Sequence, residues 1–276
     1  MALAPSKPSV YGQGHHESVL RAHSWRTVAN SAAYIVPHLK PNFRVLDVGC
    51  GPGTITIDIA RLVPEGHVTG IEPAEAENVL AGARSLAAEQ GVHNVDFAVG
   101  DVYALEYPDA TFDVVHAHQV LQHVGDPVKA LREMRRVAKP GGFIAVREAD
   151  SSSKICYPYS DEISSYWKLF QDISRANGGE PDAGRRLHVW AKQAGFDPAG
   201  ISCSSSTWCH YTPEQRAWWG NLWAERILAS KFASNAKKYG LADDETLKKH
   251  ADTWKTWAAD DDGWFSLTHG EIIARV

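Results

Sequence analysis

Hydrophobic and polar positions alternate along the chain in a way that predicts a sheet covered by helices on both faces. Short apolar runs, as in buried strands, are separated by stretches in which apolar residues recur at helical spacing. The predicted strands are Phe43–Gly49, His67–Glu72, Val95–Asp101, Phe112–His118 and Phe143–Ala149. The helices between them are Thr54–Leu62, Glu75–Gln90 and Pro127–Ala138. This alternation is typical of an α/β fold with a mostly parallel sheet.

Further elements follow after residue 200. Alternating residues with β-branched ends predict a strand at Ile201–Trp208, and Phe265–Val276 also has strand character. Between these two segments, Thr212 followed by a proline opens a helix, and a second helix covers about Asp243–Ala259. Residues 212–263 are therefore predicted to form a helical insertion between the last two strands.

The end of the first predicted strand combines an acid with three glycines. Asp47 is followed by Gly49, Gly51 and Gly53, whereas a dinucleotide fingerprint would need its third glycine at Thr54. A carboxylate beside a loop that binds pyrophosphate would repel that ligand. It suits a ligand with a cationic amino-acid end and no phosphate, and S-adenosylmethionine is such a ligand.

Two more acids follow the next two strands. Glu72 ends the second strand, where a carboxylate can accept hydrogen bonds from both hydroxyls of a ribose. Asp101 ends the third strand, where it can accept the exocyclic amine of adenine while Val102 pairs through its backbone. Because ligands bind at the carboxyl edge of such sheets, Asp47, Glu72 and Asp101 are predicted to face one site.

Composition and net charge argue against some classes of binding partner. The chain of 276 residues is 44% hydrophobic, has a mean hydropathy of -0.30 and lacks an apolar run of the ~20 residues that span a membrane. Its net charge of -5 argues against nucleic acid as a partner. We therefore expect a soluble, cytoplasmic protein with no membrane or nucleic-acid partner. The spacing of Cys50, Cys156, Cys203 and Cys209 suits neither a zinc site nor a disulfide framework, so no metal is expected.

Four stretches carry a resemblance to a known family: VLDVGCGPG, GIEP, VGDVYALEYPDATFDVVHAHQVLQHV and LREMRRVAKPGG. They resemble the class I S-adenosylmethionine-dependent methyltransferases, and within them the small-molecule group related to ubiquinone and menaquinone biosynthesis methyltransferases. The resemblance is strong over about residues 25–150 and weak beyond them. One departure is Glu72-Pro73, where the family more often has an aspartate followed by a residue other than proline.

The resemblance implies a Rossmann-like, seven-stranded, mostly parallel sheet whose last strand is antiparallel, with S-adenosylmethionine as cofactor. In such a sheet, Phe265–Val276 is predicted to lie between the fifth strand and Ile201–Trp208. The cofactor contacts implied by the resemblance, together with one from the N-terminal segment, are Asp47, Gly49, Gly51, Glu72, Asp101, Val102, His118, Gln119 and Tyr11.

One domain, residues 1–276, is expected, with three regions. Residues 1–40 would form a helical lid, since apolar spacing predicts a helix over Ser18–Leu39 and related enzymes fold this segment over the cofactor pocket. Residues 41–150 would bind the cofactor, and residues 151–276 would form the substrate side. The sequence leaves a homodimer open.

Histidines near the fourth strand are the candidates for a general base. His118 and His123 lie five positions apart, so only one is expected to face the cofactor. His118 is also expected to lie along the cofactor, and His123 has packing or capping as its alternative role. His15, His16 and His23 of the N-terminal segment are further candidates, and His23 is also a candidate substrate contact.

The C-terminal third is rich in tryptophan. The chain holds ten tryptophans, and those in predicted helices can form either core or an apolar acceptor cavity. Trp218 and Trp219 are the candidate acceptor contacts. The loop Arg175–Leu187 either borders this cavity or is a surface connection.

The sequence therefore predicts transfer of a methyl group from S-adenosylmethionine to a small organic acceptor, in secondary or quinone-type metabolism. The acceptor atom, whether O, N, S or C, stays open. Two alternatives are a non-catalytic relative that binds the cofactor to regulate a partner, and a nicotinamide-dependent oxidoreductase.

Overall fold

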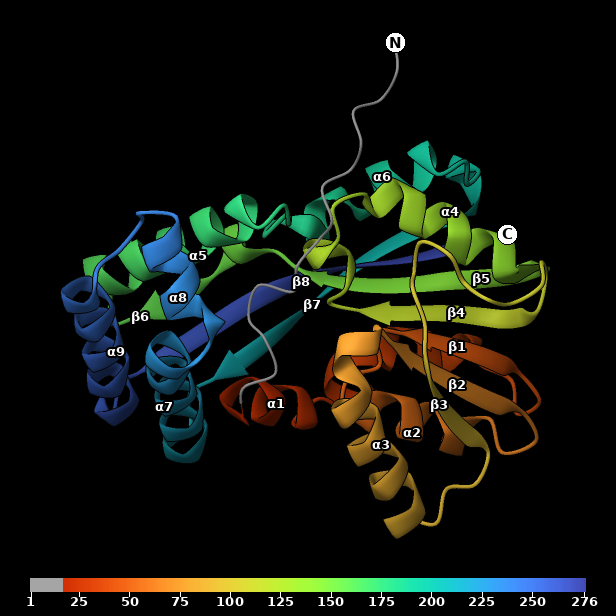
Figure 1. Ribbon diagram of the computed structural model, residues 1–276, viewed down its shortest axis with the longest axis horizontal. Helices are drawn as coiled ribbons and strands as arrows, with labels where there is room; N and C mark the ends of the chain where they lie inside the picture. The colour runs from red at the N-terminus through yellow and green to blue at the C-terminus, as the bar shows by residue number, and fades with distance from the viewer. Residues whose placement is uncertain (1–16) are drawn as a thin grey trace.

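A twisted eight-stranded sheet runs through the molecule in the computed structural model, which describes residues 17–276 (Figure 1). The strand order is β3-β2-β1-β4-β5-β8-β6, and β7 pairs with the opposite edge of β8. The strands are β1 (Arg44–Val48), β2 (His67–Glu72), β3 (Val95–Val99), β4 (Phe112–His118), β5 (Ala138–Ala149), β6 (Ile155–Tyr157), β7 (Ile201–His210) and β8 (Trp264–Arg275). The five strands predicted before residue 150 are confirmed.

The last strand, β8, lies inside the sheet. Ala274 of β8 pairs with Ile144 of β5 on one side and with Ile201 of β7 on the other. Strands β1 to β5 pair in parallel, whereas β8 is antiparallel to all of its neighbours. The predicted position of Phe265–Val276 between the fifth strand and Ile201–Trp208 is therefore confirmed. The short strand β6, which extends the β5 edge of β8, was not predicted.

Helices cover both faces of the sheet (Figure 1). They are α1 (Glu17–Ser24), α2 (Thr54–Leu62), α3 (Glu77–Glu89), α4 (Pro127–Val137), α5 (Asp161–Ala176), α6 (Leu187–Gln193), α7 (Pro213–Ala229), α8 (Lys231–Lys238) and α9 (Asp244–Ala259). Helices α4 and α6 lie on one face, and α2 and α3 lie on the other. Helices α7, α8 and α9 form the predicted insertion at the far end of β8.

The prediction of one continuous helix over Ser18–Leu39 is wrong, because the helix is interrupted between Ser24 and Val28. Helix α1 ends at Ser24, and a π-helical turn begins after Thr27, followed by a 3-10 helix. The Thr27 hydroxyl accepts from the Asn30 amide and the Asn30 side chain accepts from the Thr27 amide. This reciprocal cap restarts the helix, because it satisfies amides that have no partner in a first turn.

The hydrophobic core is layered on the two faces of the sheet. One layer joins Val146 of β5 to Leu131 of α4 and Trp190 of α6, and the other joins Val45 of β1 to Ile59 of α2. A separate aromatic cluster fills the space between α5, α7, α9 and the β7–β8 pair. No helix within residues 17–276 is long and apolar enough to span a membrane.

Candidate functional site

The loop after β1 has a backbone conformation that favours glycine at three positions. Gly49, Gly51 and Gly53 have φ angles of +69°, +55° and +81°. A Cβ atom added to Gly53 would lie 2.9 Å from the Ala83 side chain, so Gly53 permits close packing of the loop on α3. At Gly51 the same atom would meet only Glu72 Oε1 among the described residues, at 4.0 Å. Gly51 therefore presents bare backbone to a space that no atom of residues 17–276 fills.

Glu72 lies directly against this loop. Its Oε1 atom accepts a hydrogen bond of 2.6 Å from the Gly51 amide. Burial raises the pKa of Glu72 to about 7, and the nearby Asp47 charge adds to this rise while the Gly51 bond opposes it. A ligand that donates hydrogen bonds to this carboxylate would favour its ionised form.

Asp47 is buried and already bonded. The residue is only 2% exposed. Its Oδ2 atom accepts a hydrogen bond of 2.6 Å from the Thr56 hydroxyl, and its Oδ1 atom lies 2.7 Å from His116 Nδ1. The carboxylate thus ties β1 to α2 and to β4. It does not present an exposed oxygen to the carboxyl edge of the sheet.

Asp101 is exposed just beyond β3. Its Oδ1 accepts from the Tyr103 amide at 2.8 Å, which fixes the turn at this strand end. Val102 is half-buried and packs against the core. The Tyr103 hydroxyl accepts from the Asp126 amide at 2.8 Å, so this turn is joined to the start of α4. The ends of β1, β2 and β3 thus carry Gly51, Glu72 and Asp101 along one edge of the sheet.

The segment after β4 contacts the glycine loop. Gln119 has a φ of +55°, which is uncommon for a residue other than glycine. Its Oε1 accepts from Arg26 at 2.8 Å, and its Nε2 lies 2.9 Å from His269 Nε2. A Cβ atom on Gly49 would lie only 2.3 Å from the next residue, Val120, so the two loops are in close contact.

Glu148 of β5 fixes the backbone of the segment after β4 by hydrogen bonds. It is fully buried and accepts hydrogen bonds from the amides of Val120, Leu121 and Gln122, at 2.8, 2.7 and 3.2 Å. Burial raises the pKa of Glu148 to about 8 despite these bonds. Three backbone donors therefore define the conformation of the loop that carries Gln119.

The two candidate base histidines are both poor proton acceptors. His118 is 5% exposed, no described residue bonds to its ring nitrogens, and burial together with the charges of Arg26 and Arg147 lowers its pKa well below 6.5. Burial, with Arg26 and Arg226, lowers the pKa of His123 to about 4. Both rings are therefore neutral at neutral pH.

Three charged or polar residues near the site were missed in the sequence. Arg147 of β5 lies next to His118 in the sheet register, and Glu271 and His269 come from β8. The available signal was the presence of Arg147–Glu148 within the apolar run FIAVREA, and of HGE within the last strand. Charged residues inside an apolar strand are buried only when they are paired or functional.

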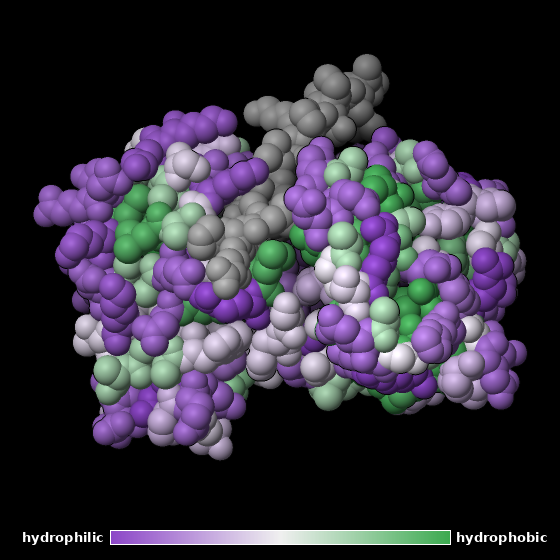
Figure 2. Space-filling view, turned by 60° about the horizontal axis from the view of Figure 1, so that its bottom comes forward, coloured by the Kyte–Doolittle hydropathy of each residue, from purple (hydrophilic) through white to green (hydrophobic). Residues whose placement is uncertain are grey.

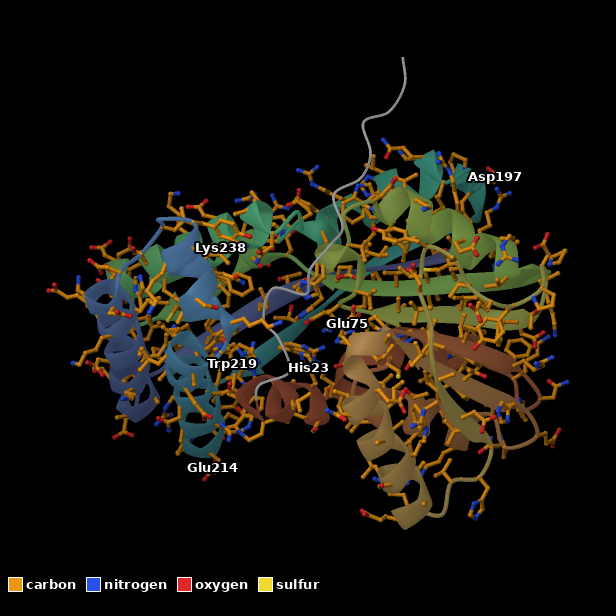
Figure 3. The ribbon with its side chains drawn as sticks, in the orientation of Figure 1. His23, Glu75, Asp197, Glu214, Trp219 and Lys238 are labelled. Carbon is orange, nitrogen blue, oxygen red and sulfur yellow. The ribbon has the colours of Figure 1, made fainter. Side chains whose placement is uncertain are left out.

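The two candidate acceptor tryptophans differ in exposure. Trp219 is 4% exposed and stacks on His210 with ring centroids 4.4 Å apart, so it belongs to the aromatic core. Trp218 is half-buried and lies 5.3 Å from Trp25 of the N-terminal segment. Figure 3 shows His23 of α1 in the same central region, between Trp219 and Glu75 in this view. Tyr11, His15 and His16 lie outside the described residues.

The loop over Arg175–Leu187 packs against the carboxyl edge of the sheet. The Glu180 amide donates to the Gln122 carbonyl at 2.9 Å, and the Ser151 amide donates to the Pro181 carbonyl at 3.0 Å. In Figure 2 the insertion and the half of the molecule that carries β1 to β4 form two lobes, and the surfaces of both lobes mix hydrophilic and hydrophobic residues. Among residues 17–276, no group of three His, Cys, Asp or Glu side chains is placed to hold a metal ion.

A Rossmann-like sheet with a glycine loop after β1 and acids at the ends of β2 and β3 defines a class I S-adenosylmethionine-dependent methyltransferase. The chain belongs to the methyltransferase domain family, whose model matches residues 39–195. It is 39% identical to an uncharacterized methyltransferase of Schizosaccharomyces pombe over 279 residues, covering 98% of each chain. S-adenosylmethionine is accordingly its cofactor.

Two further similarities are weaker, the first in the length that it covers and the second in sequence identity. The chain is 43% identical to the demethylmenaquinone methyltransferase of Listeria monocytogenes over 130 residues, which cover 47% of this chain and 53% of that one. The structure is similar to that of phosphoethanolamine N-methyltransferase 2 from Haemonchus contortus, which contains S-adenosylhomocysteine. That likeness has a TM-score of 0.55 at 18% identity and covers 94% of this chain and 57% of the other, so it shows the fold alone.

Proposed function

We propose that the protein transfers a methyl group from S-adenosylmethionine to a small organic acceptor. The observation that carries this proposal is the single edge formed by Gly51, Glu72 and Asp101 at three neighbouring strand ends. The open space beside Gly51, the hydrogen-bond-accepting Glu72 and the exposed Asp101 fit the amino-acid, ribose and adenine parts of this cofactor.

The cofactor-binding roles follow the chemistry of each residue. Glu72 would accept the ribose hydroxyls, and Asp101 with the Val102 backbone would hold the adenine. Gly49 and Gly51 let the backbone approach the amino-acid end, with Gln119 and His118 on its other side and Tyr11 as a further contact. Asp47 acts through Thr56 and His116, holding the glycine loop rather than contacting the ligand directly.

When bound, the cofactor supplies an electrophilic methyl group. The residues of the chain orient the acceptor and exclude water. His118, as a neutral ring, can form one hydrogen bond to the acceptor, and it or His123 would take a proton only with difficulty because both pKa values are low. Trp218 and His23 would border the acceptor.

A small organic acceptor agrees with the net charge of -5, which argues against a nucleic-acid substrate, and with the aromatic residues beside the site. The N-terminal segment would act as a lid over it. Its described part packs on the insertion, since Arg21 forms an ion pair with Glu225 and Arg226 donates to the Ser18 carbonyl.

The test is to incubate the protein with isotopically labelled S-adenosylmethionine and a metabolite extract, and to search for labelled products by mass spectrometry. A labelled small molecule, formed together with S-adenosylhomocysteine, is the expected result. Binding of S-adenosylhomocysteine without turnover on any acceptor would favour a non-catalytic role. A change in NADH fluorescence on mixing, without binding of S-adenosylhomocysteine, would favour an oxidoreductase.

A further inference from the structure

A row of polar side chains crosses the sheet next to the proposed cofactor site. His118 of β4 pairs in register with Arg147 of β5, Arg147 pairs with Glu271 of β8, and Glu271 pairs with Ser204 of β7. Residues directly opposite one another on neighbouring strands lie on the same face. The row is buried, with Arg147 fully inaccessible and His118 and Glu271 each 5% exposed.

Arg147 is fixed in this row by only one edge of its guanidinium group. Its Nε donates to the Ser206 hydroxyl at 2.9 Å and lies 3.3 Å from Glu271 Oε1. The Ser204 hydroxyl donates to the other oxygen of Glu271 at 2.7 Å, which holds the carboxylate on this edge. No described residue accepts a hydrogen bond from Nη1 or Nη2, although both atoms are buried.

An unpaired guanidinium fork in a buried position is energetically costly. A planar, two-oxygen anion would satisfy both amino groups at once, because the fork matches the geometry of a carboxylate. The structure therefore contains a donor pair of fixed direction that lacks its acceptor.

The surroundings of the fork favour an anion. Trp208 lies within cation–π distance of both Arg147 and Arg26, at 5.0 and 5.5 Å, and its ring centroid is 4.2 Å from that of His269. Burial and the charges of Arg26 and Arg147 lower the pKa values of His118 and His269 well below 6.5, and burial raises the pKa of Tyr34. These three groups are neutral. Among the described residues, the carboxyl groups that act on the Arg147 charge are Glu271, on the opposite edge of the guanidinium, and the buried Glu148, whose own pKa is raised to about 8.

The row is also connected to the cofactor loop. His118 is followed by Gln119, which contacts His269, and by Val120, which packs on Gly49. A molecule held between His118 and Arg147 would therefore lie one strand away from the glycine loop. The bend at Trp25–Thr27 covers this place, since Trp25 lies 5.3 Å from Trp208.

We infer that Arg147 binds the methyl acceptor, and that the acceptor group it recognises is an oxyanion, either a carboxylate or an ionised phenol or enol. This inference rests on the proposed function. The anion occupies Nη1 and Nη2, and the neutral His118 forms a second hydrogen bond to it. A phenol or enol releases its proton to solvent as it binds, because the Arg147 charge favours the ionised form. No protein side chain is then required as a base.

The experiment is calorimetry on the full chain saturated with S-adenosylhomocysteine, with three probes of similar size. These are benzoate, 4-nitrophenolate and benzyltrimethylammonium. At least one of the two anions is expected to bind, and the cation is not. Benzoate binding alone would indicate a carboxylate, and 4-nitrophenolate binding alone would indicate a phenol or enol.

Variants then test Arg147 itself. Glu271→Gln is the matched control, and Arg147→Met in the Glu271→Gln background removes the guanidinium without leaving a buried carboxylate unpaired. The double variant should bind the anion about 10- to 100-fold more weakly than Glu271→Gln alone. Arg147→Lys should also lose affinity, because lysine keeps the charge and lacks the fork.

Equal anion affinity in Glu271→Gln and the double variant would overturn the inference, as would binding of the cation alone or of no probe. Unchanged affinity for S-adenosylhomocysteine shows that each variant is folded. Failure of the unaltered protein to bind S-adenosylhomocysteine would instead contradict the proposed function, so the two failures are distinguishable.

Discussion

The backbone amide of Gly51 donates a 2.6 Å hydrogen bond to Oε1 of Glu72, a residue 21 positions further along the chain. This bond joins the loop after β1 to the end of β2. It places a carboxylate beside the one glycine of the loop at which an added side chain would meet no close neighbour within residues 17–276. The proposed ribose contact of Glu72 depends on this relationship.

Replacing Glu72 with alanine should weaken binding of S-adenosylhomocysteine by ~1.5–3 kcal/mol, the size of hydrogen bonds to a charged group. Calorimetry measures this directly. Glu75→Ala is the matched control, because Glu75 is an exposed acid just beyond the same strand. Equal affinity in the two variants would remove Glu72 from the cofactor site.

Cofactor affinity should also depend on pH through Glu72. Its pKa of about 7 lies above the ordinary 4.5, so the carboxyl is partly protonated at neutral pH. Ribose hydroxyls donate to the ionised form, and affinity should therefore fall as the pH drops below about 7. The raised pKa also means that the contribution of Glu72 to stability is present below pH 4.5 and is lost as the pH rises through about 7. The Glu72→Gln variant should lose the pH dependence of affinity; a slope that persists would point to another group.

Gly51→Val should abolish cofactor binding while the protein stays folded. A β-branched residue is strained at a φ of +55°, and its side chain would fill the open space beside Glu72. Gly82→Ala is the control, since Gly82 lies within α3 and no atom of the described part of the chain comes within 4 Å of an added Cβ. This change should stabilise the protein by about 0.5–1 kcal/mol. Circular dichroism and calorimetry separate the two effects. Cofactor binding by Gly51→Val would show that the space is not used.

Trp218 and Trp219 should respond differently to substitution by alanine. Trp219→Ala should lower the free energy of unfolding by about 3–5 kcal/mol, because its ring is buried in the aromatic core. Trp218→Ala should mainly raise the Michaelis constant for the acceptor. Thermal unfolding and steady-state kinetics measure the two outcomes. An unchanged Michaelis constant in Trp218→Ala would exclude this residue from the acceptor site.

Removing residues 1–16 should leave a folded protein that binds cofactor and turns over slowly. The reason is that α1 remains packed on α7 in the shortened chain, whereas the proposed lid over the acceptor is lost. The measurement is kcat for the acceptor alongside the affinity for S-adenosylhomocysteine. Full activity of the shortened protein would contradict the lid.

Those features of the fold that depend on the local pattern of apolar residues could be predicted from the sequence. The bounds of β2 and β4 follow from short apolar runs, and the position of Glu72 and Asp101 at one edge of the sheet follows from the parallel strand order. The hydrogen bonds that hold Asp47 to Thr56 and His116 were not predicted. The pairing of Arg147 with Glu271 could not be predicted, because it joins residues 124 positions apart through a strand order that sequence does not display. The break at Thr27 was hidden for a different reason, since apolar residues keep helical spacing on both sides of it.

Strand β8 also limits how the helical insertion can move relative to the cofactor-binding half of the molecule. Along one edge it pairs with β5 at residues 269–275 and with β6 at residues 264–266, and along the other edge it pairs with β7 at residues 265–274. A hinge between the cofactor half and the helical insertion would need a few residues free to change their φ and ψ angles, and residues 265–274 of β8 are paired with β7 without a break. The cofactor half and the helical insertion are therefore joined through a continuously paired strand. Among the described residues, the Trp25–Thr27 bend packs on Trp208, which contacts Arg147, so we expect access to Arg147 to depend on this bend and not on a change within β8.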